Sequence, residues 1–240
     1  MLAQCPRTRR CSEVAGRSAL CRRAVRPAGT GTAFALAWAG PIPAYRRRDP
    51  GPRRHPTMTA ELTALTGDYV LDPTHTRIGF VARHAMVTKV RGAFHQFEGT
   101  AHLDGATPAQ STAQVVIKTE SIDTGVEQRD QHLRTNDFLD APNFPDITFR
   151  STSVEPQSDT EYRVTGDLTI KDTTRPVTID FEYTGNAVDP YGNLRVGLEG
   201  SVAISRKEFG VTWNAALEGG GVLVGDKVVL EFDISAIKQG

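Results

Sequence analysis

Apolar residues alternate with polar ones, in one short run after another, from residue 67 to residue 238. The clearest run places Val177, Ile179, Phe181 and Tyr183 on one face of an extended segment, with a polar residue after each. A two-residue period is typical of an antiparallel strand that is buried on one face only. The chain is therefore expected to form an antiparallel sheet with one apolar face.

The same period recurs along the rest of this region, and turn-prone stretches such as Asp104-Gly105 and residues 189–192 separate the runs. About eight or nine strands result, which is enough to close a barrel. The strongest further runs are 164–170, 194–204 and 228–234, and the weaker ones are 69–71, 76–83, 92–103, 113–118 and 147–154.

A sheet of this size needs a cover for its apolar face, and the sequence offers a single candidate helix. That helix is predicted over residues 125–135, because Thr124 and Glu127 have the spacing of a capping box. Its residues 127–131 are all polar, so it cannot cover the whole sheet. The sheet must cover itself, either as a closed barrel or as a two-sheet sandwich.

Charge divides the chain into two unlike parts. Residues 1–57 hold twelve arginines, no lysine and two acidic residues, a formal charge of +10. Residues 58–240 hold 16 basic and 26 acidic side chains, so the net charge of zero arises only because the charges of the two parts cancel. All three cysteines lie in the first part. Residues 58–240 are expected to form one domain, because a chain of that length buries a core without disulfides.

Three interpretations of residues 1–57 stay open, and none makes this basic leader part of the fold. An arginine-rich start and the apolar stretch 33–39 suggest an export signal. A nucleic-acid-binding arm has less support, because lysine and interleaved aromatic residues are missing. The third is a translation start at Met58, since GC-rich non-coding DNA would encode such a composition. A start at Met58 predicts a cytoplasmic protein, and a cleaved leader predicts a periplasmic or extracellular one.

The sequence contains no recognisable catalytic motif. It lacks a G-x-S-x-G elbow, an H-E-x-x-H pair, a C-x-x-C pair and a P-loop. His75, His84 and His132 are candidates for a metal site, but no i, i+2 or i, i+4 ligand pair supports one. These histidines are therefore expected to make structural hydrogen bonds, and no metal ligand or catalytic residue is predicted.

Several charged residues are also predicted to be structural. Arg129 and Asp130 point in different directions on the predicted helix, so each is expected to tie the helix to a loop or to the barrel rim. Asp72 is likewise predicted to be a structural residue. Arg206 follows a strand, where a solvated charge is the simpler interpretation and a cationic mouth for an anionic head group is the alternative. Trp213 is expected to pack in the core or at the rim, or to contact a ligand.

Ten short motifs, in order along residues 67–238, give the chain a family resemblance. They are Asp72-Pro73-Thr74-His75, Arg83-His84, Gly92-Ala93-Phe94, Ser121-Ile122-Asp123-Thr124, Arg129-Asp130-Gln131-His132-Leu133, Asp137-Phe138, Pro145-Asp146-Ile147-Thr148-Phe149, Val164-Thr165-Gly166-Asp167-Leu168-Thr169-Ile170, Arg206-Lys207-Glu208-Phe209-Gly210 and Val224-Gly225-Asp226. Together they resemble the YceI-like family of bacterial polyisoprenoid-binding proteins. The resemblance implies a lipocalin-like, eight-stranded antiparallel barrel with one short helix against it. It also implies a tunnel for a long isoprenoid or other lipid chain, and no catalytic residue or further cofactor.

The residues themselves support a hollow interior. Gly166 and Gly200 occupy inward-type positions where a packed barrel would hold leucine or phenylalanine, which predicts open space inside. Burying one five-carbon isoprene unit yields up to about 4 kcal/mol. The predicted tunnel lining is Phe80, Phe149, Leu168, Ile170, Ile179, Phe181, Val196 and Leu198, with Phe138 and Trp213 nearer the mouth.

Two other functions remain open from the sequence. One is a lipid-modifying enzyme that uses His84, His132 or Arg129, and the other is a stress-related structural protein whose barrel is filled by its own side chains. The predicted partner is an isoprenoid quinone, a polyprenyl phosphate, a fatty-acid derivative or another long-chain lipid. Nucleic acid and stable membrane insertion are not expected, and a homodimer stays open.

Overall fold

The computed structural model describes residues 62–240, so the predictions for the basic leader and for a start at Met58 lie outside the described residues. The strands are β1 (Gly67–Leu71), β2 (Arg77–His84), β3 (Thr88–Phe94), β4 (Phe97–Leu103), β5 (Thr112–Lys118), β6 (Ile122–Asp123), β7 (Asp146–Pro156), β8 (Glu161–Ile170), β9 (Thr173–Val188), β10 (Leu194–Ser205) and β11 (Val224–Lys238). The helices are α2 (Glu127–Arg134) and the 3-10 turns η1 (Pro108–Gln110), η2 (Thr119–Ser121) and η3 (Arg206–Phe209), and residues 62–64 are also helical.

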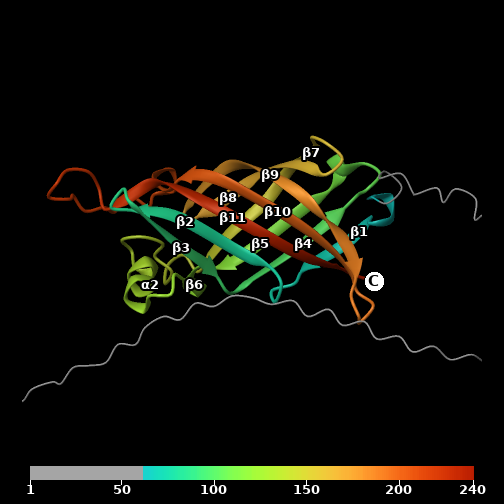
Figure 1. The fold of residues 1–240 in the computed structure, drawn as a ribbon, viewed down its shortest axis with the longest axis horizontal. Coiled ribbons are helices and arrows are strands. Elements are labelled where there is room, and N and C mark those ends of the chain that lie inside the picture. The colour runs from blue at the N-terminus through green and yellow to red at the C-terminus, as the bar shows by residue number, and fades with distance from the viewer. Residues whose placement is uncertain (1–61) are drawn as a thin grey trace, which may run out of the picture. The chain divides into compact units, whose positions relative to one another are not determined.

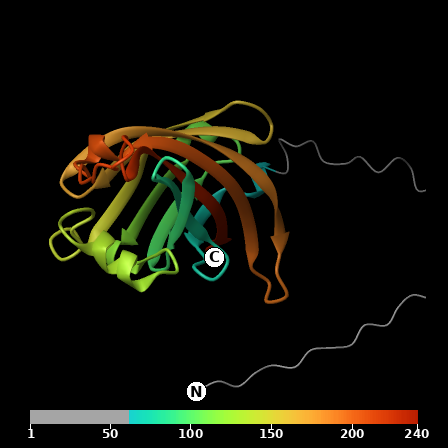
Figure 2. The ribbon, with the colours of Figure 1, turned by 60° about the vertical axis from the view of Figure 1, so that its left-hand side comes forward.

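The described residues form one antiparallel sheet that closes on itself. Its strand order is β1-β4-β5-β7-β8-β9-β10-β11-β2-β3-β6, and β1 also pairs with β11. Since β1 leads into β2, β3 into β4 and β5 into β6, the eleven segments make eight long strands around one axis (Figures 1 and 2). The predicted lipocalin-like barrel is confirmed, and the two-sheet sandwich is not the fold.

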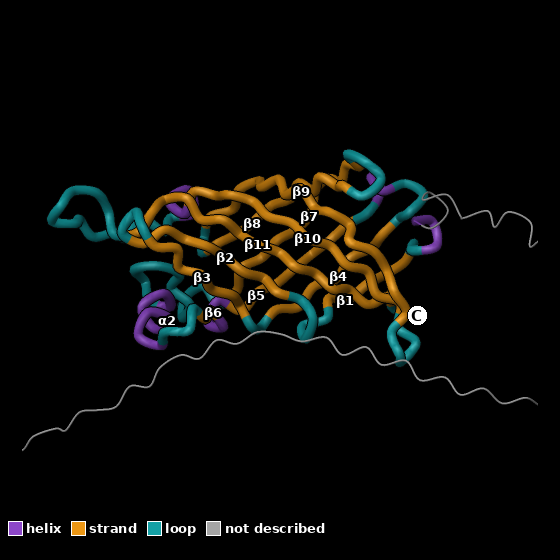
Figure 3. The backbone as a smooth tube through the Cα atoms, in the orientation of Figure 1, coloured by secondary structure: helices purple, strands orange, loops and turns teal. Residues whose placement is uncertain are grey.

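Three neighbouring strands are each broken once, and the breaks lie side by side (Figure 3). Hydrogen bonds carry the ladder across them: the Asp72 amide donates to Ser235 O, 2.8 Å away, and the His95 amide donates to Ser121 O, 3.2 Å away. The run predicted over residues 92–103 is thus two strands, separated by residues 95–96. The other predicted runs each fall within one strand apart from an end residue, because burial of one face fixes the strand register.

The core lies inside the barrel rather than between layers. Its largest buried cluster takes side chains from both broken and continuous strands, including Ile78, Ile117, Leu168 and Ile179. Helix α2 lies beside β6 at one end of the barrel (Figure 1), and its exposed surface is polar, as predicted. None of the helices among residues 62–240 has both the length and the apolar character that a membrane span requires.

Candidate functional site

An apolar cavity of about 350 Å³ occupies the barrel interior. It extends from residues near one end, such as Leu62 and Pro108, to residues near the other, such as Leu133 and Val211. Side chains from every long strand contribute to its wall, and nearly all of the lining atoms are carbon. Its size is within the range of about 300–1,000 Å³ found for small-molecule sites.

Nine of the ten predicted lining residues lie on this wall, and the tenth does not. Trp213 stands one layer outside, where its ring packs against Phe138 with a centroid distance of 5.1 Å. Face parity located the eight that lie on strands, because each strand keeps its register, and Phe138 lies in the turn after α2. The nine are Phe80, Phe138, Phe149, Leu168, Ile170, Ile179, Phe181, Val196 and Leu198.

The inward glycines do not leave open space in the way that was expected. A Cβ on Gly166 would come within 2.4 Å of the Phe149 ring, and one on Gly200 would come within 2.6 Å of the Phe181 ring. The space above each glycine is therefore filled by an aromatic ring from the neighbouring strand. This packing holds the rings against the wall, which keeps the centre of the lumen clear.

Aromatic side chains gather at the α2 end of the cavity. The His132 ring makes edge contacts with Phe138 and Trp213, at centroid distances of 5.0 and 4.9 Å. His132 Nε2 also lies 2.9 Å from a carboxylate oxygen of Asp137. His132 thus connects the helix to the Phe138 side chain that forms part of the cavity wall.

The start of α2 differs from the predicted capping box. The helix begins at Glu127, its N-cap is Val126, and no side chain caps it. The Thr124 hydroxyl and amide instead donate to Oδ1 of Asp130, which is 3% exposed. Arg129 Nε donates to Thr124 Oγ1 across 2.7 Å, and Arg129 Nη2 donates to the Thr124 carbonyl. Arg129 and Asp130 therefore bind the same residue and fasten the helix to the preceding loop.

Arg206 is buried and is not a solvated strand-end charge. Its guanidinium donates to the carbonyl oxygens of Gly225, Val211, Trp213 and Val224, at distances from 2.7 to 3.3 Å. Burial lowers the pKa of this guanidinium from its ordinary value. Arg206 thus closes a loop at the α2 end of the barrel, and the prediction of a solvated charge is wrong.

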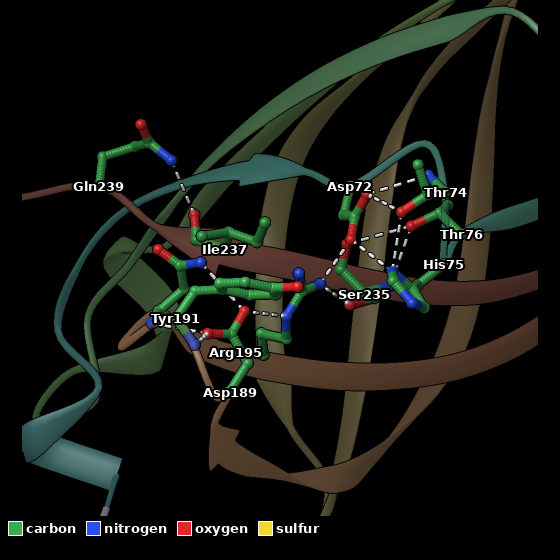
Figure 4. Close-up of polar contacts among 11 residues, drawn as sticks. Asp72, Thr74, His75, Thr76, Asp189, Tyr191, Arg195, Ser235, Ile237 and Gln239 are labelled. Carbon is green, nitrogen blue, oxygen red and sulfur yellow. Dashed lines mark hydrogen bonds and ion pairs between the residues drawn. The ribbon is translucent and has the colours of Figure 1, made fainter.

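The motif around Asp72 forms a second polar cluster at the break between β1 and β2 (Figure 4). The Asp72 carboxylate is buried and accepts hydrogen bonds from the Thr74 amide and hydroxyl. His75 Nδ1 lies 2.6 Å from Oδ2 of Asp72, and Arg195 Nη1 donates to the same oxygen across 2.5 Å. The hydrogen bond from Arg195, followed by that from Thr74, holds the pKa of Asp72 well below its usual range.

Arg195, which no motif identified, extends this cluster to a second carboxylate, that of Asp189. Its Nε donates to Oδ2 of Asp189, 2.9 Å away. Asp189 also accepts hydrogen bonds from the backbone amide and from the side-chain amide of Asn193. The side-chain hydrogen bond from Asn193 is the main cause of a pKa of Asp189 well below its ordinary value. The Asp-Pro turn signalled Asp189, but nothing in the spacing pairs Arg195 with Asp72.

The remaining candidate, His84, is an exposed residue at the end of β2. It is not on the cavity wall, and neither are His132 and Arg129. Within residues 62–240, no group of three or more His, Cys, Asp or Glu side chains is arranged to hold a metal ion.

Comparisons with known proteins agree with this architecture. The model of the YceI-like domain matches residues 69–236. A UPF0312 protein of Yersinia pestis is 38% identical over 152 residues, 62% of this chain and 79% of its own, and one of Vibrio cholerae is 35% identical over 156 residues, 64% and 82%.

Solved structures share the fold. Burkholderia cenocepacia BcnA has a TM-score of 0.61 at 27% identity, covering 69% of this chain and 98% of that one. The Campylobacter jejuni YCEI protein has a TM-score of 0.56 at 25% identity, covering 66% and 90%. A polyisoprenoid binding domain from Saccharophagus degradans, 14% identical with a TM-score of 0.55, is similar in fold and covers 71% and 98%.

Proposed function

The chain belongs to the YceI-like family, and on that premise we propose that its barrel binds a long-chain isoprenoid or a similar lipid without modifying it. The observation that carries the proposal is the almost wholly apolar cavity, which runs along the barrel between its two ends. A wall made almost wholly of carbon atoms offers few polar groups to orient a reaction, and it suits a hydrocarbon chain.

The energetics favour a chain of several isoprene units. Each buried methylene contributes about 0.8 kcal/mol, so one isoprene unit contributes up to about 4 kcal/mol. Association and ordering of the chain cost about 4 to 15 kcal/mol. Two or three buried units therefore offset these costs and give affinity in the micromolar range or better. We expect affinity to rise with chain length until the cavity is filled.

The head group contributes less than the chain. The lining has few polar atoms, so an isoprenoid quinone, a polyprenyl phosphate and a fatty-acid derivative are all expected to bind through their tails. A binder of this kind serves carriage, storage or sequestration of the lipid. The open cavity counts against the alternative of a barrel filled by its own side chains.

The enzyme alternative has less support. His132 and Arg129 are engaged with Asp137 and Thr124, and neither lines the cavity. Alanine substitution of His84, His132 and Arg129 separates the two functions. We expect each variant to retain lipid binding, with losses confined to stability. Loss of turnover of a bound lipid at unchanged stability would favour catalysis instead.

The test of binding compares a substitution that blocks the lumen with the same substitution at an exposed position. Leu198 lies on the cavity wall in β10, whereas the adjacent Glu199 is exposed. We expect native mass spectrometry to detect added ubiquinone or undecaprenyl phosphate on the unmodified chain and on the Glu199→Trp variant. Leu198→Trp should reduce the bound fraction at least tenfold, because the indole occupies the lumen. Equal loading of the two variants, or no loading of the unmodified chain, contradicts the proposal.

A further inference from the structure

Two loops lie together at the α2 end of the barrel, and the second of them projects well beyond it (Figure 1). One is the turn of residues 85–87 between β2 and β3, and the other is the segment 212–223 that precedes β11. The Ala85 amide donates to the carbonyl of Leu223, 2.6 Å away. Beside this bond, a Cβ on Gly221 would be 3.9 Å from Cγ of Met86. We call these paired loops the double tip.

The double tip exposes apolar side chains. Met86 is 59% exposed, Val87 is 77% exposed and Val222 is 40% exposed. Ala85 and Met86 also have positive φ angles, 49° and 61°, in a turn where asparagine and glycine are the favoured residues. Folding stability therefore does not account for apolar residues at this turn, and a binding partner does.

Strands β2 and β3, which carry the first of the two loops, are cationic in a domain that is otherwise acidic, and the second loop holds one acidic residue, Glu218. Residues 73–97 contain four Lys or Arg side chains and no Asp or Glu, whereas residues 58–240 as a whole have an excess of acids. Arg83 and Lys89 are direct cross-strand partners, and Arg91 is two residues further along β3. All three are exposed, and none forms an ion pair with another described residue.

From this arrangement we propose that the double tip docks on an anionic lipid bilayer. Met86, Val87 and Val222 enter the interfacial region, and Arg83, Lys89 and Arg91 lie at the level of the lipid phosphates. Exposed apolar residues next to a row of cations are the combination that binds anionic membrane surfaces. The tip projects instead of forming a groove, so it suits a lipid surface better than a peptide or a folded protein.

Docking in this way would place the cavity end against the membrane. The segment 212–223 is flanked by Val211 and Val224, which both line the cavity, and Arg206 binds the carbonyls of both flanking residues. A lipid leaving the bilayer would therefore reach the cavity over a short path. The benefit of docking rests on the proposed function, but docking itself is measured without a tunnel ligand.

The experiment must report on the tip itself, because the basic leader of the full chain would also attract anionic vesicles. We place a fluorescent residue at the tip with Val87→Trp and at the opposite end of the barrel with Val188→Trp. Val188 is 66% exposed, so both sites accept an indole without repacking. The chain's own Trp38 and Trp213 are common to both variants. The vesicles contain phosphatidylcholine with or without phosphatidylglycerol, and part of the lipid is brominated to quench inserted indoles.

With the phosphatidylglycerol vesicles we expect a larger blue shift and stronger quenching for Val87→Trp than for Val188→Trp, whose response is limited to that of the shared Trp213 in the segment 212–223. Adding Lys89→Glu and Arg91→Glu to Val87→Trp should weaken the apparent affinity at least tenfold. Equal quenching of the two tryptophan variants, or none for Val87→Trp, overturns the proposal, as does a soluble protein that binds the tip in place of vesicles. Native mass spectrometry on Val87→Trp separates lipid binding in the cavity from docking of the double tip. Lipid loading without quenching overturns docking alone, and quenching without loading supports docking.

Discussion

Two arginines hold the two ends of strand β10 in different ways. Arg195 is the second residue of the strand and bridges two carboxylates, Asp72 and Asp189. Arg206 follows the last residue of the strand and binds only neutral carbonyl oxygens. One end of the barrel is thus held by paired charges, and the other by a buried cation among peptide groups.

The difference separates two kinds of sensitivity. Carboxylates titrate, so the Arg195 cluster weakens in acid, whereas carbonyl groups do not titrate and Arg206 keeps its partners at any ordinary pH. The Arg206 end also carries the cavity residues Val211 and Val224 and the exposed double tip. The end that we propose to meet lipid is therefore the end whose closure depends on hydrogen-bond geometry instead of charge balance.

Arg206→Met should have the largest effect on stability. The change removes the donors of four backbone carbonyls, and we expect the free energy of unfolding to fall by about 3 to 5 kcal/mol. Urea unfolding measures the loss, and hydrogen exchange should rise within residues 211–225. Arg206→Lys should retain less than half of the free energy of unfolding that Arg206→Met loses, since an ammonium cannot reach all four oxygens. A loss below about 1 kcal/mol contradicts a closing role for this side chain.

Arg195→Met should lower stability less than Arg206→Met. The Asp72 carboxylate loses its cation but keeps the donors of Thr74 and His75, so part of its charge stays compensated. Adding Asp72→Asn to Arg195→Met should recover part of the loss, because the Asp72 side chain then carries no charge that needs a cation. Thermal unfolding of the single and double variants provides the measurement. Additive losses would show that Asp72 and Arg195 do not act as a pair.

These two ends also show how far the sequence could be interpreted alone. The alternation of side chains predicted a sheet that covers itself and the eight wall residues that lie on strands, because a strand register moves all its side chains together, whereas the family resemblance selected the barrel. Arg206 and Asp72 both stand in the YceI-like motifs. Their partners were not predictable, since Arg206 binds carbonyls of a loop that folds back on it and Arg195 is 123 residues from Asp72.

Local side-chain competition explains the other failures. Thr124 had the spacing of a helix cap, but Asp130 accepts its amide and hydroxyl, so the helix starts later. Gly166 and Gly200 were predicted to leave a void, but neighbouring phenylalanine rings cover them. In each case several nearby groups could form the hydrogen bond or fill the space. Spacing along the chain does not determine which of them does so.

Acid should test the Arg195 end selectively. Hydrogen bonds from Arg195 and Asn193 hold the pKa values of Asp72 and Asp189 below the ordinary value for aspartate. A carboxylate with a lowered pKa in the folded state adds stability above its unfolded pKa, near pH 4, and loses it as the pH falls toward the folded value. We expect the free energy of unfolding to decline below about pH 4. Asp72→Asn should flatten this decline, and Arg206→Met should leave its slope unchanged. Equal slopes for Asp72→Asn and the unmodified chain would refute the assignment.

Tyr69→Phe should have the smallest effect, and it probes the Arg195 end without touching its charges. The Tyr69 hydroxyl donates to the carbonyl of Leu65, 2.7 Å away, and the side chain is 1% exposed. Burial raises the pKa of this phenol, so the hydroxyl stays protonated and donates throughout the neutral range. Removing it costs about 0.5 to 1.5 kcal/mol, because one carbonyl loses its donor while the ring keeps its packing against Val196 and Ala236. Urea unfolding at neutral pH and at pH near 4 should give the same loss, since neither group titrates there; a loss that grows in acid would link Tyr69 to the Asp72 cluster.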